Sequence, residues 1–168
     1  MKSLIINKTK SRIPKTFIAS WNDSVVLKLK SRKVRFSKSA TELVVVVVSK
    51  SEMRTLNSDY RGKDYATDVL SFVSQEPNSL GELVICADVL KKQAKEHGLT
   101  FQQELGYMLL HGILHLLGFD HESDEKEAKR MFKLQDDVFE ELCHSSKHVT
   151  TSREHRSKKK VRVRTRAL

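Results

Sequence analysis

The feature that most constrains the fold is the unbroken aliphatic run Leu43–Val48, in which five of the six residues are valine. A β-branched run without a polar face predicts a strand buried on both sides, as in sheets whose two faces are covered by helices. Six residues are far fewer than the roughly 20 that a membrane-spanning helix requires. The run therefore predicts the central strand of a sheet, and no membrane span is expected.

Around this run, the pattern of apolar residues predicts three further strands and five helices. The further strands are expected at residues 2–7, 69–72 and 83–86, the last two joined by a hairpin. The first helix is expected to have Pro14 in its first turn and to extend to Leu29, and the second to begin at Ser51. The third is expected to be capped by Asp88 and to end near His97, and the fourth to be capped by Thr100, three residues before Gln103, and to end near Gly118. The last is expected to start at Ser123 or Asp124. A polar loop is expected at 57–67. The predicted fold class is α/β (α+β): a single domain with a small mixed sheet of about four strands packed with about five helices.

The net charge of +10 is unevenly spread along the chain. Residues 1–50 contain 12 basic and 2 acidic residues, residues 51–146 contain 10 and 18, and residues 147–168 contain 9 and 1. Two basic blocks around an acidic middle indicate a polyanion held by the periphery and a cation held by the middle; a soluble surface with a solvated tail would give the same counts. We expect a folded domain at 1–146 and a basic, disordered tail at 147–168.

Two further features bear on the cellular compartment. Cys86 and Cys143 are too few for a disulfide framework and lack C-x-x-C spacing, so both are expected to be reduced thiols. The N-terminal residues turn polar after three apolar positions and lack a signal-peptide cleavage site. A cytoplasmic location is therefore expected.

Three histidines form the most specific motif of the sequence. His111 and His115 are four residues apart on the longest predicted helix, so both imidazoles leave the same helix face. Gly118 can adopt the left-handed conformation that ends the helix and allows His121 to approach the other two. Three imidazoles with a fourth position open are typical of a catalytic zinc site. Ordinary histidines on an amphipathic helix are the alternative, which the glycine and the third histidine argue against.

The spacing H-x-x-x-H-x-x-G-x-x-H resembles the zinc motif of the metzincin proteases, with one departure. Their general-base glutamate follows the first histidine, and Gly112 stands at that position here. Glu104 lies on the same helix face as His111 but two turns, roughly 10 Å, away, so it is expected at most to support the site. Asp120 could fix the tautomer of a ligand histidine by accepting its ring N–H, or could cap the following turn.

A second motif precedes the histidines: residues 56–72 contain L-N-x-x-Y-R-G-K-D-x-x-T-D-V-L-S-F. With H-G-x-L-H-L-x-G-x-D-H at 111–121, it resembles the YbeY endoribonucleases, strongly over about residues 40–142 and before that only in the order of strand and helix. The resemblance implies a single-domain α/β metalloprotein that cleaves single-stranded RNA. It also implies a part in 16S rRNA 3′-end maturation and ribosome quality control.

The resemblance implies site residues as well. The family's zinc ligands fall on His111, His115 and His121, and its functional arginine falls on Arg61. Guanidinium binds phosphate with two hydrogen bonds, whereas an ion pair of Arg61 with Asp64 or Asp68 would only shape the loop. Tyr60 and Lys63 are possible RNA contacts. Val73 and Glu82 depart from the proline and aspartate frequent in the family.

The resulting hypothesis is a zinc-dependent endoribonuclease in which the ion acts on the phosphate, Arg61 binds it and the basic flanks hold the RNA backbone. A second hypothesis is a ribosome-assembly factor that binds RNA without cutting it and whose zinc orders the helix end. A third, a zinc peptidase, is disfavoured by Gly112. The expected partners are single-stranded ribosomal RNA and the small ribosomal subunit; no DNA and no membrane is expected.

Overall fold

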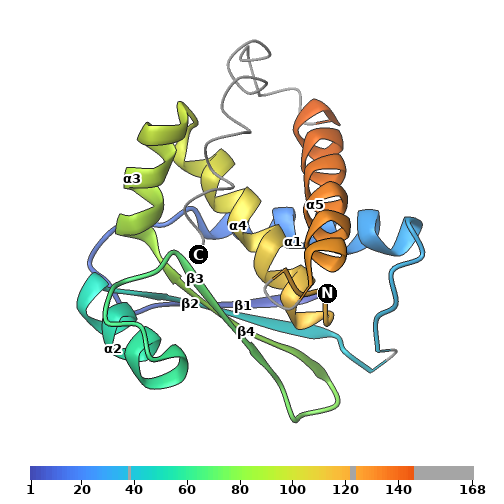
Figure 1. The fold of residues 1–168 in the computed structure, drawn as a ribbon. Helices are drawn as coiled ribbons and strands as arrows, with labels where there is room; N and C mark the ends of the chain where they lie inside the picture. Colours follow the sequence, from blue (N-terminus) through green and yellow to red (C-terminus); the bar gives the residue numbers. More distant parts are fainter. Residues whose placement is uncertain (38, 122–123, 146–168) are drawn as a thin grey trace.

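The computed structural model describes residues 1–37, 39–121 and 124–145. Within them, four strands form one sheet (Figure 1): β1 (Lys2–Asn7), β2 (Glu42–Val48), β3 (Val69–Val73) and β4 (Ser79–Cys86). Their order across the sheet is β1-β2-β4-β3. Strands β1, β2 and β4 are parallel, and β3 pairs with β4 in the antiparallel direction as a hairpin. The sheet is therefore mixed, as predicted, and β3 forms one of its edges.

The valine run is the interior strand β2. Val46 pairs with Ile6 of β1 on one side and with Val84 of β4 on the other. Leu43 and the residues from Val45 to Val48 are buried. The prediction of a strand buried on both faces is confirmed.

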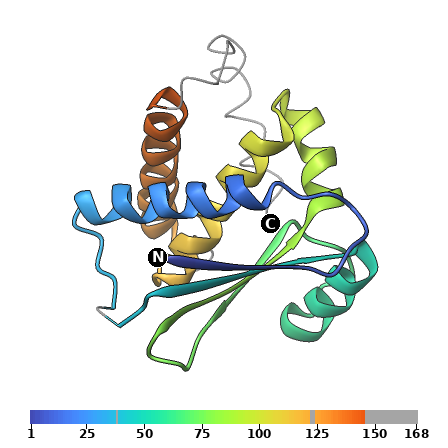
Figure 2. The same cartoon turned by 180° about the vertical axis from the view of Figure 1, so that it is seen from behind.

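Five helices complete the described part: α1 (Lys15–Ser31), α2 (Lys50–Arg61), α3 (Ala87–His97), α4 (Phe101–Leu116) and α5 (Glu125–Ser145). One face of the sheet is covered by α1 and α4, against which α5 packs, and α2 lies at the other face (Figures 1 and 2). The structure is a mixed α/β domain. None of the helices within the described ranges is long and apolar enough to cross a membrane.

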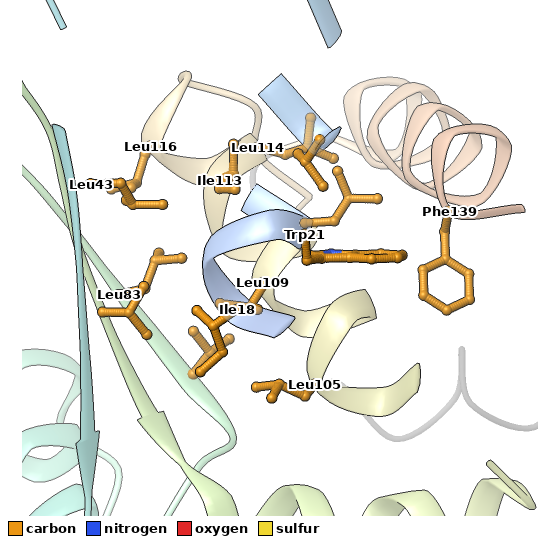
Figure 3. Close-up of a cluster of buried hydrophobic side chains, with 14 of the residues drawn as sticks. Ile18, Trp21, Leu43, Leu83, Leu105, Leu109, Ile113, Leu114, Leu116 and Phe139 are labelled. Atoms are coloured by element: carbon orange, nitrogen blue, oxygen red, sulfur yellow. The ribbon is translucent and has the colours of Figure 1, made fainter. Parts of the chain in front are cut away.

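The larger apolar core lies between the sheet and the helices α1, α4 and α5 (Figure 3). Trp21 extends from α1 toward Phe139 of α5, with ring centroids 5.6 Å apart, and its indole N–H donates to the carbonyl of Gly106 on α4 at 2.8 Å. A side chain at position 106 would place its Cβ 2.9 Å from the indole. The glycine thus lets the large ring pack against the α4 backbone, which fixes the helix that carries the histidine motif.

The second helix differs from its prediction at both ends. It begins at Lys50, one residue earlier than expected, because the Ser49 hydroxyl accepts a hydrogen bond from the Glu52 N–H at 3.2 Å. It continues to Arg61, so the first five residues of the loop predicted at 57–67 are helical. Of residues 57–61, four are exposed and only Asn57 is buried, so these residues show no apolar periodicity from which a helix could be predicted.

Other helix boundaries are partly as expected. Thr100 forms a capping box with Gln103 at the start of α4, as predicted. Asp88 was expected to cap α3, but that helix follows β4 directly and Asp88 lies in its first turn. Pro14 precedes α1 instead of lying in its first turn. At the start of α5, the Asp124 carboxylate accepts a hydrogen bond from the Lys126 N–H at 3.2 Å; the alternative Ser123 and the tail 147–168 lie outside the described residues.

Candidate metal centre

Helix α4 presents His111 and His115 one turn apart on a single face. Their Nε2 atoms lie 3.1 Å from each other and their ring centroids 4.6 Å. The strong capping box at the start of α4 and the packing of Trp21 on its backbone hold the helix that sets this spacing. The i, i+4 prediction of one shared face is therefore confirmed.

A glycine turn brings His121 to the same place. After α4, Gly118 has φ +85°, and its N–H donates to the carbonyl of His115 at 2.9 Å. The ring of His121 then lies with its centroid 5.2 Å from that of His111 and 5.0 Å from that of His115. One ring nitrogen from each of the three histidines lies within 4.8 Å of the others. The three imidazoles thus converge as the sequence motif predicts.

The donor set fits a divalent transition ion. Zinc binds imidazole nitrogen at about 2.0–2.1 Å, and tetrahedral geometry then separates two ligand nitrogens by roughly 3.3 Å. The observed 3.1 Å between the Nε2 atoms of His111 and His115 is close to this separation. Three imidazoles leave one tetrahedral position for a substrate oxygen or water. The arrangement therefore has the chemistry of a catalytic site more than that of a closed structural site.

Burial keeps two of the imidazoles neutral. Desolvation lowers the pKa of His111, and the neighbouring His121 and Arg61 lower it further, while the hydrogen bond with Gln135 and the charge of Asp68 oppose the shift. Burial, followed by the charges of His111 and His121, lowers the pKa of His115 to about 4. Neutral imidazole is the form that binds metal, so at neutral pH both rings are in the state that a metal ion requires.

The second nitrogen of each α4 imidazole has a partner. Nδ1 of His111 lies 2.9 Å from Oε1 of Gln135 on α5, and the ring of His115 hydrogen bonds to the backbone of Phe119. Such contacts orient metal-binding histidines and raise their basicity. Phe132 of α5 lies beside the centre, with its ring centroid 5.2 Å from that of His121.

Gln135 and Phe132 are not among the site residues predicted from the sequence. A signal for Gln135 was present, because it is a polar residue between Met131 and Val138 on the apolar face of α5. Its contact with His111 depends on how two helices pack, which local patterns do not reveal. Phe132 carried no comparable signal.

Packing explains the glycine after the first histidine. A Cβ at position 112 would lie 2.7 Å from Cδ2 of Leu83 on β4 and 3.2 Å from Oγ of Ser71 on β3. Leu83 is fully buried, so it has little room to move. Position 112 therefore faces the sheet, and a glutamate base of the metzincin kind does not fit there.

Arg61 is the last residue of α2 and acts electrostatically on His111. Gly62, with φ +67°, ends the helix in the left-handed conformation and donates its N–H to the carbonyl of Ser58 at 2.9 Å. Buried Asn57 holds the following loop, because its amide donates to the carbonyl of Tyr65 at 2.8 Å. The Gly62 cap and the buried Asn57 amide thus fix the end of α2, and with it the position of the Arg61 backbone.

The two aspartates considered as partners of Arg61 are engaged elsewhere. Asp64 accepts two hydrogen bonds of 2.6 Å from Arg54, which hold the pKa of its carboxyl below the usual value. Asp68 accepts from the Gln93 amide at 3.0 Å and from the Val69 N–H at 2.8 Å.

Three further predicted site residues, Glu104, Asp120 and Tyr60, have different surroundings. Glu104 is buried, and its Oε2 lies 2.9 Å from Nδ1 of His97 on α3, so its hydrogen bond is not with the three histidines. Asp120 lies close enough to His115 to raise its pKa, which opposes part of the burial effect. Tyr60 is exposed and packs edge to face on Phe72, with ring centroids 4.9 Å apart.

Tyr60 and Phe72 line a groove together with Leu56, on the face of the sheet where α2 lies. His111 and His115 lie on α4, which packs on the opposite face, and His121 follows the turn after that helix. Lys63 is exposed in the loop after α2. Arg61, at the end of α2, lowers the pKa of His111 by its charge.

Comparison with known proteins gives concordant matches. The family model described as endoribonuclease YbeY matches residues 4–143. The endoribonuclease YbeY of Bdellovibrio bacteriovorus is 56% identical over 143 residues, which covers 84% of this chain and 95% of the relative. That of a Sulfurihydrogenibium species is 38% identical over 146 residues, covering 83% and 91%. The solution structure of TM1509 from Thermotoga maritima superposes with a TM-score of 0.59 at 30% identity, covering 86% and 91%.

Proposed function

The chain belongs to the endoribonuclease YbeY family, and from this premise we propose that it is a metal-dependent endoribonuclease that cleaves single-stranded RNA. The observation that carries the proposal is the convergence of three histidine nitrogens within 4.8 Å, with a coordination position left over. Buried, neutral imidazoles at neutral pH support the same conclusion.

His111, His115 and His121 would hold the ion, and we propose zinc. All three donors are nitrogen, which suits zinc, and their spacing fits tetrahedral coordination. When bound, zinc supplies Lewis-acid charge at a phosphoryl oxygen. The fit of the donor set supports zinc but is shared with other divalent transition ions.

Arg61 would bind the phosphate. A guanidinium donates two parallel hydrogen bonds to phosphate oxygens and stabilises the charge that develops on them during transfer. Its electrostatic effect on His111 supports a position near the centre. Gly112 has no side chain that could accept a proton beside the first histidine. The chain would therefore contribute to catalysis chiefly by orienting the phosphate and by supplying positive charge.

The substrate we propose is ribosomal RNA, with the 3′ end of 16S rRNA as the cleavage region and the small ribosomal subunit as the partner. The names of the relatives imply an RNA substrate. The 12 basic residues within 1–50 and the 9 within 147–168 would add contacts with the phosphate backbone. We propose the cytoplasm as the location and a division into a folded domain at 1–146 and a basic tail at 147–168.

Gly112 also favours a second candidate, a ribosome-assembly factor that binds RNA without cutting it. The first ligand is followed by no carboxylate, and Leu83 leaves no room for one. In this case zinc would order the turn after α4 and RNA affinity would be the function. The same packing disfavours a peptidase of the metzincin type.

Cleavage by two arginine variants separates these candidates. Arg61→Ala should lower kcat/KM on a single-stranded RNA by about 100-fold or more, as loss of an oxyanion donor does, without loss of zinc. Arg54→Ala is the matched control, since Arg54 lies two turns earlier on α2 and pairs with Asp64. A duplex of the same sequence should be cut poorly. If zinc-loaded wild type binds the RNA and cuts nothing, the assembly factor is the better account.

A further inference from the structure

A buried glutamine on α5 contacts the candidate metal centre. Gln135 has no exposed surface, although it carries a polar amide between Met131 and Val138. A buried amide without hydrogen bonds destabilises the folded chain, so the partners of Gln135 decide whether it is tolerated. Both ends of the amide have partners on α4: the ring of His111 and the carbonyl of Tyr107.

These two partners fix the direction of the amide. The Gln135 NH₂ group donates to the Tyr107 carbonyl at 3.4 Å, so Oε1 faces Nδ1 of His111 at 2.9 Å. Rotating the amide by 180° would bring its oxygen against the carbonyl oxygen, where neither can donate. Since Oε1 only accepts, Nδ1 of His111 must carry the proton. Nε2 is then the nitrogen with a free lone pair, and it is the one that faces His115.

We propose that Gln135 is a positioning residue that selects Nε2 of His111 as the metal ligand and so links the docking of α5 on α4 to metal affinity. The proposal rests on the proposed metal centre. It assigns to α5, which supplies none of the three histidines, a direct part in building the site. A residue that only satisfied its own hydrogen bonds between two helices would affect stability but not the choice of ligand nitrogen.

A second hydrogen bond between the same helices provides the control. The Tyr107 hydroxyl donates to Oδ1 of Asp136 at 3.0 Å, so Tyr107→Phe removes a bond between α4 and α5 while keeping the ring. The ring of Tyr107 retains its edge-to-face contact with Phe139, whose centroid is 5.2 Å away. This variant weakens the helix contact without touching the imidazole of His111.

Zinc affinity is measured by competition with a chromophoric chelator on the full chain, in the absence of RNA. Gln135→Leu should weaken zinc binding by about 10–100-fold, the usual effect of losing the partner of a ligand histidine. Gln135→Glu keeps an acceptor oxygen and should stay within about threefold of wild type or bind more tightly. Tyr107→Phe should leave the affinity unchanged. Wild-type affinity in Gln135→Leu, or an equal loss in Tyr107→Phe, overturns the proposal.

The tautomer itself is measured on the metal-free wild type by ¹⁵N NMR of the histidine rings, which requires no variant to fold. The expected result is a protonated Nδ1 and an unprotonated Nε2 at His111; the opposite tautomer overturns the proposal. Neither measurement uses RNA. A wild type that binds zinc but cuts no RNA would therefore contradict the proposed activity and leave this inference to be decided by its own data.

Discussion

Nε2 of His111 and Nε2 of His115 face each other across 3.1 Å. The other nitrogen of His111 donates to Gln135, and the ring of His115 hydrogen bonds to the backbone of Phe119, which raises its pKa as a donated bond to a carbonyl does. In the tautomer with Nδ1 of each ring protonated, both Nε2 atoms carry lone pairs. Two facing lone pairs repel unless a cation lies between them, so this pair is arranged for an ion.

The buried histidines predict that the metal-free protein is sensitive to mild acid. The pKa of His115 is lowered from 6.5 to about 4 by folding. Between these two pH values, His115 therefore binds a proton in the unfolded chain but not in the folded chain. The free energy of unfolding should therefore decrease as the pH falls from about 6.5 to about 4. Urea unfolding of the metal-free protein at pH 7, 6 and 5 measures this slope.

Two variants separate this effect from general acid titration. His115→Ala should reduce the loss of stability between pH 7 and pH 5, while the exposed His144→Ala should not. A wild type whose stability is constant or rises over this interval would contradict the assignment of a buried neutral imidazole.

Gly112→Ala should destabilise the protein although alanine is the better helix former. In an exposed helix the change would gain up to about 1 kcal/mol, but here the new Cβ would lie 2.7 Å from buried Leu83. Overpacking of this kind costs about 1–3 kcal/mol. Chemical denaturation should show a net decrease in the free energy of unfolding. The control Ser58→Ala, at an exposed position of α2, should change this free energy by no more than about 0.5 kcal/mol. A more stable Gly112→Ala would show that α4 can move away from the sheet.

Removal of the metal should lower stability without unfolding the chain. The core around Trp21 and the core around Met53 are buried without any contribution from the three ligands. At free zinc 1,000 times its Kd, binding adds about 4 kcal/mol to stability, and a chelator removes this amount. Far-UV circular dichroism should keep its helical signal with a lower Tm. Complete loss of the signal on chelation would instead support zinc as the organiser of the fold.

Deletion of residues 147–168 should weaken RNA binding and flatten its salt dependence. The segment contains 9 basic residues and 1 acidic residue. Each phosphate contact made by such a residue contributes about 0.7 to the slope of log K against log salt for single strands. Fluorescence anisotropy at several salt concentrations gives the slope for the full chain and the truncated chain. An unchanged slope would remove the tail from RNA binding.

The parts of the molecule that were predicted correctly depend on local patterns. The valine run predicted β2, and the periodicity of α4 together with Gly118 predicted how the histidines converge, because the i, i+4 spacing and a glycine turn act within a few residues. Thr100 and Gln103 likewise form a capping box that can be recognised from four residues.

The parts that were missed depend on contacts between distant residues. Asn57 lies in a helix and not in the predicted loop, since its buried amide binds the carbonyl of Tyr65 in a tertiary contact. The approach of Gln135 to His111 spans 24 residues and requires the packed geometry of two helices. The sequence shows that Gly112 supplies no base, but the physical cause, the close packing of α4 against Leu83 of β4, is visible only in the structure.

Metal-dependent cleavage is tested most directly by measuring zinc content and RNA cleavage in parallel on wild type and His115→Ala. The substrate is a single-stranded RNA that carries a 16S 3′ end, and both proteins are purified side by side to exclude contaminating ribonuclease. Wild type should contain about one ion per chain, as a single three-histidine site requires, and should cleave the RNA, whereas the variant should do neither. Equal cleavage by the two proteins, or full cleavage by metal-free wild type, would contradict metal-dependent cleavage.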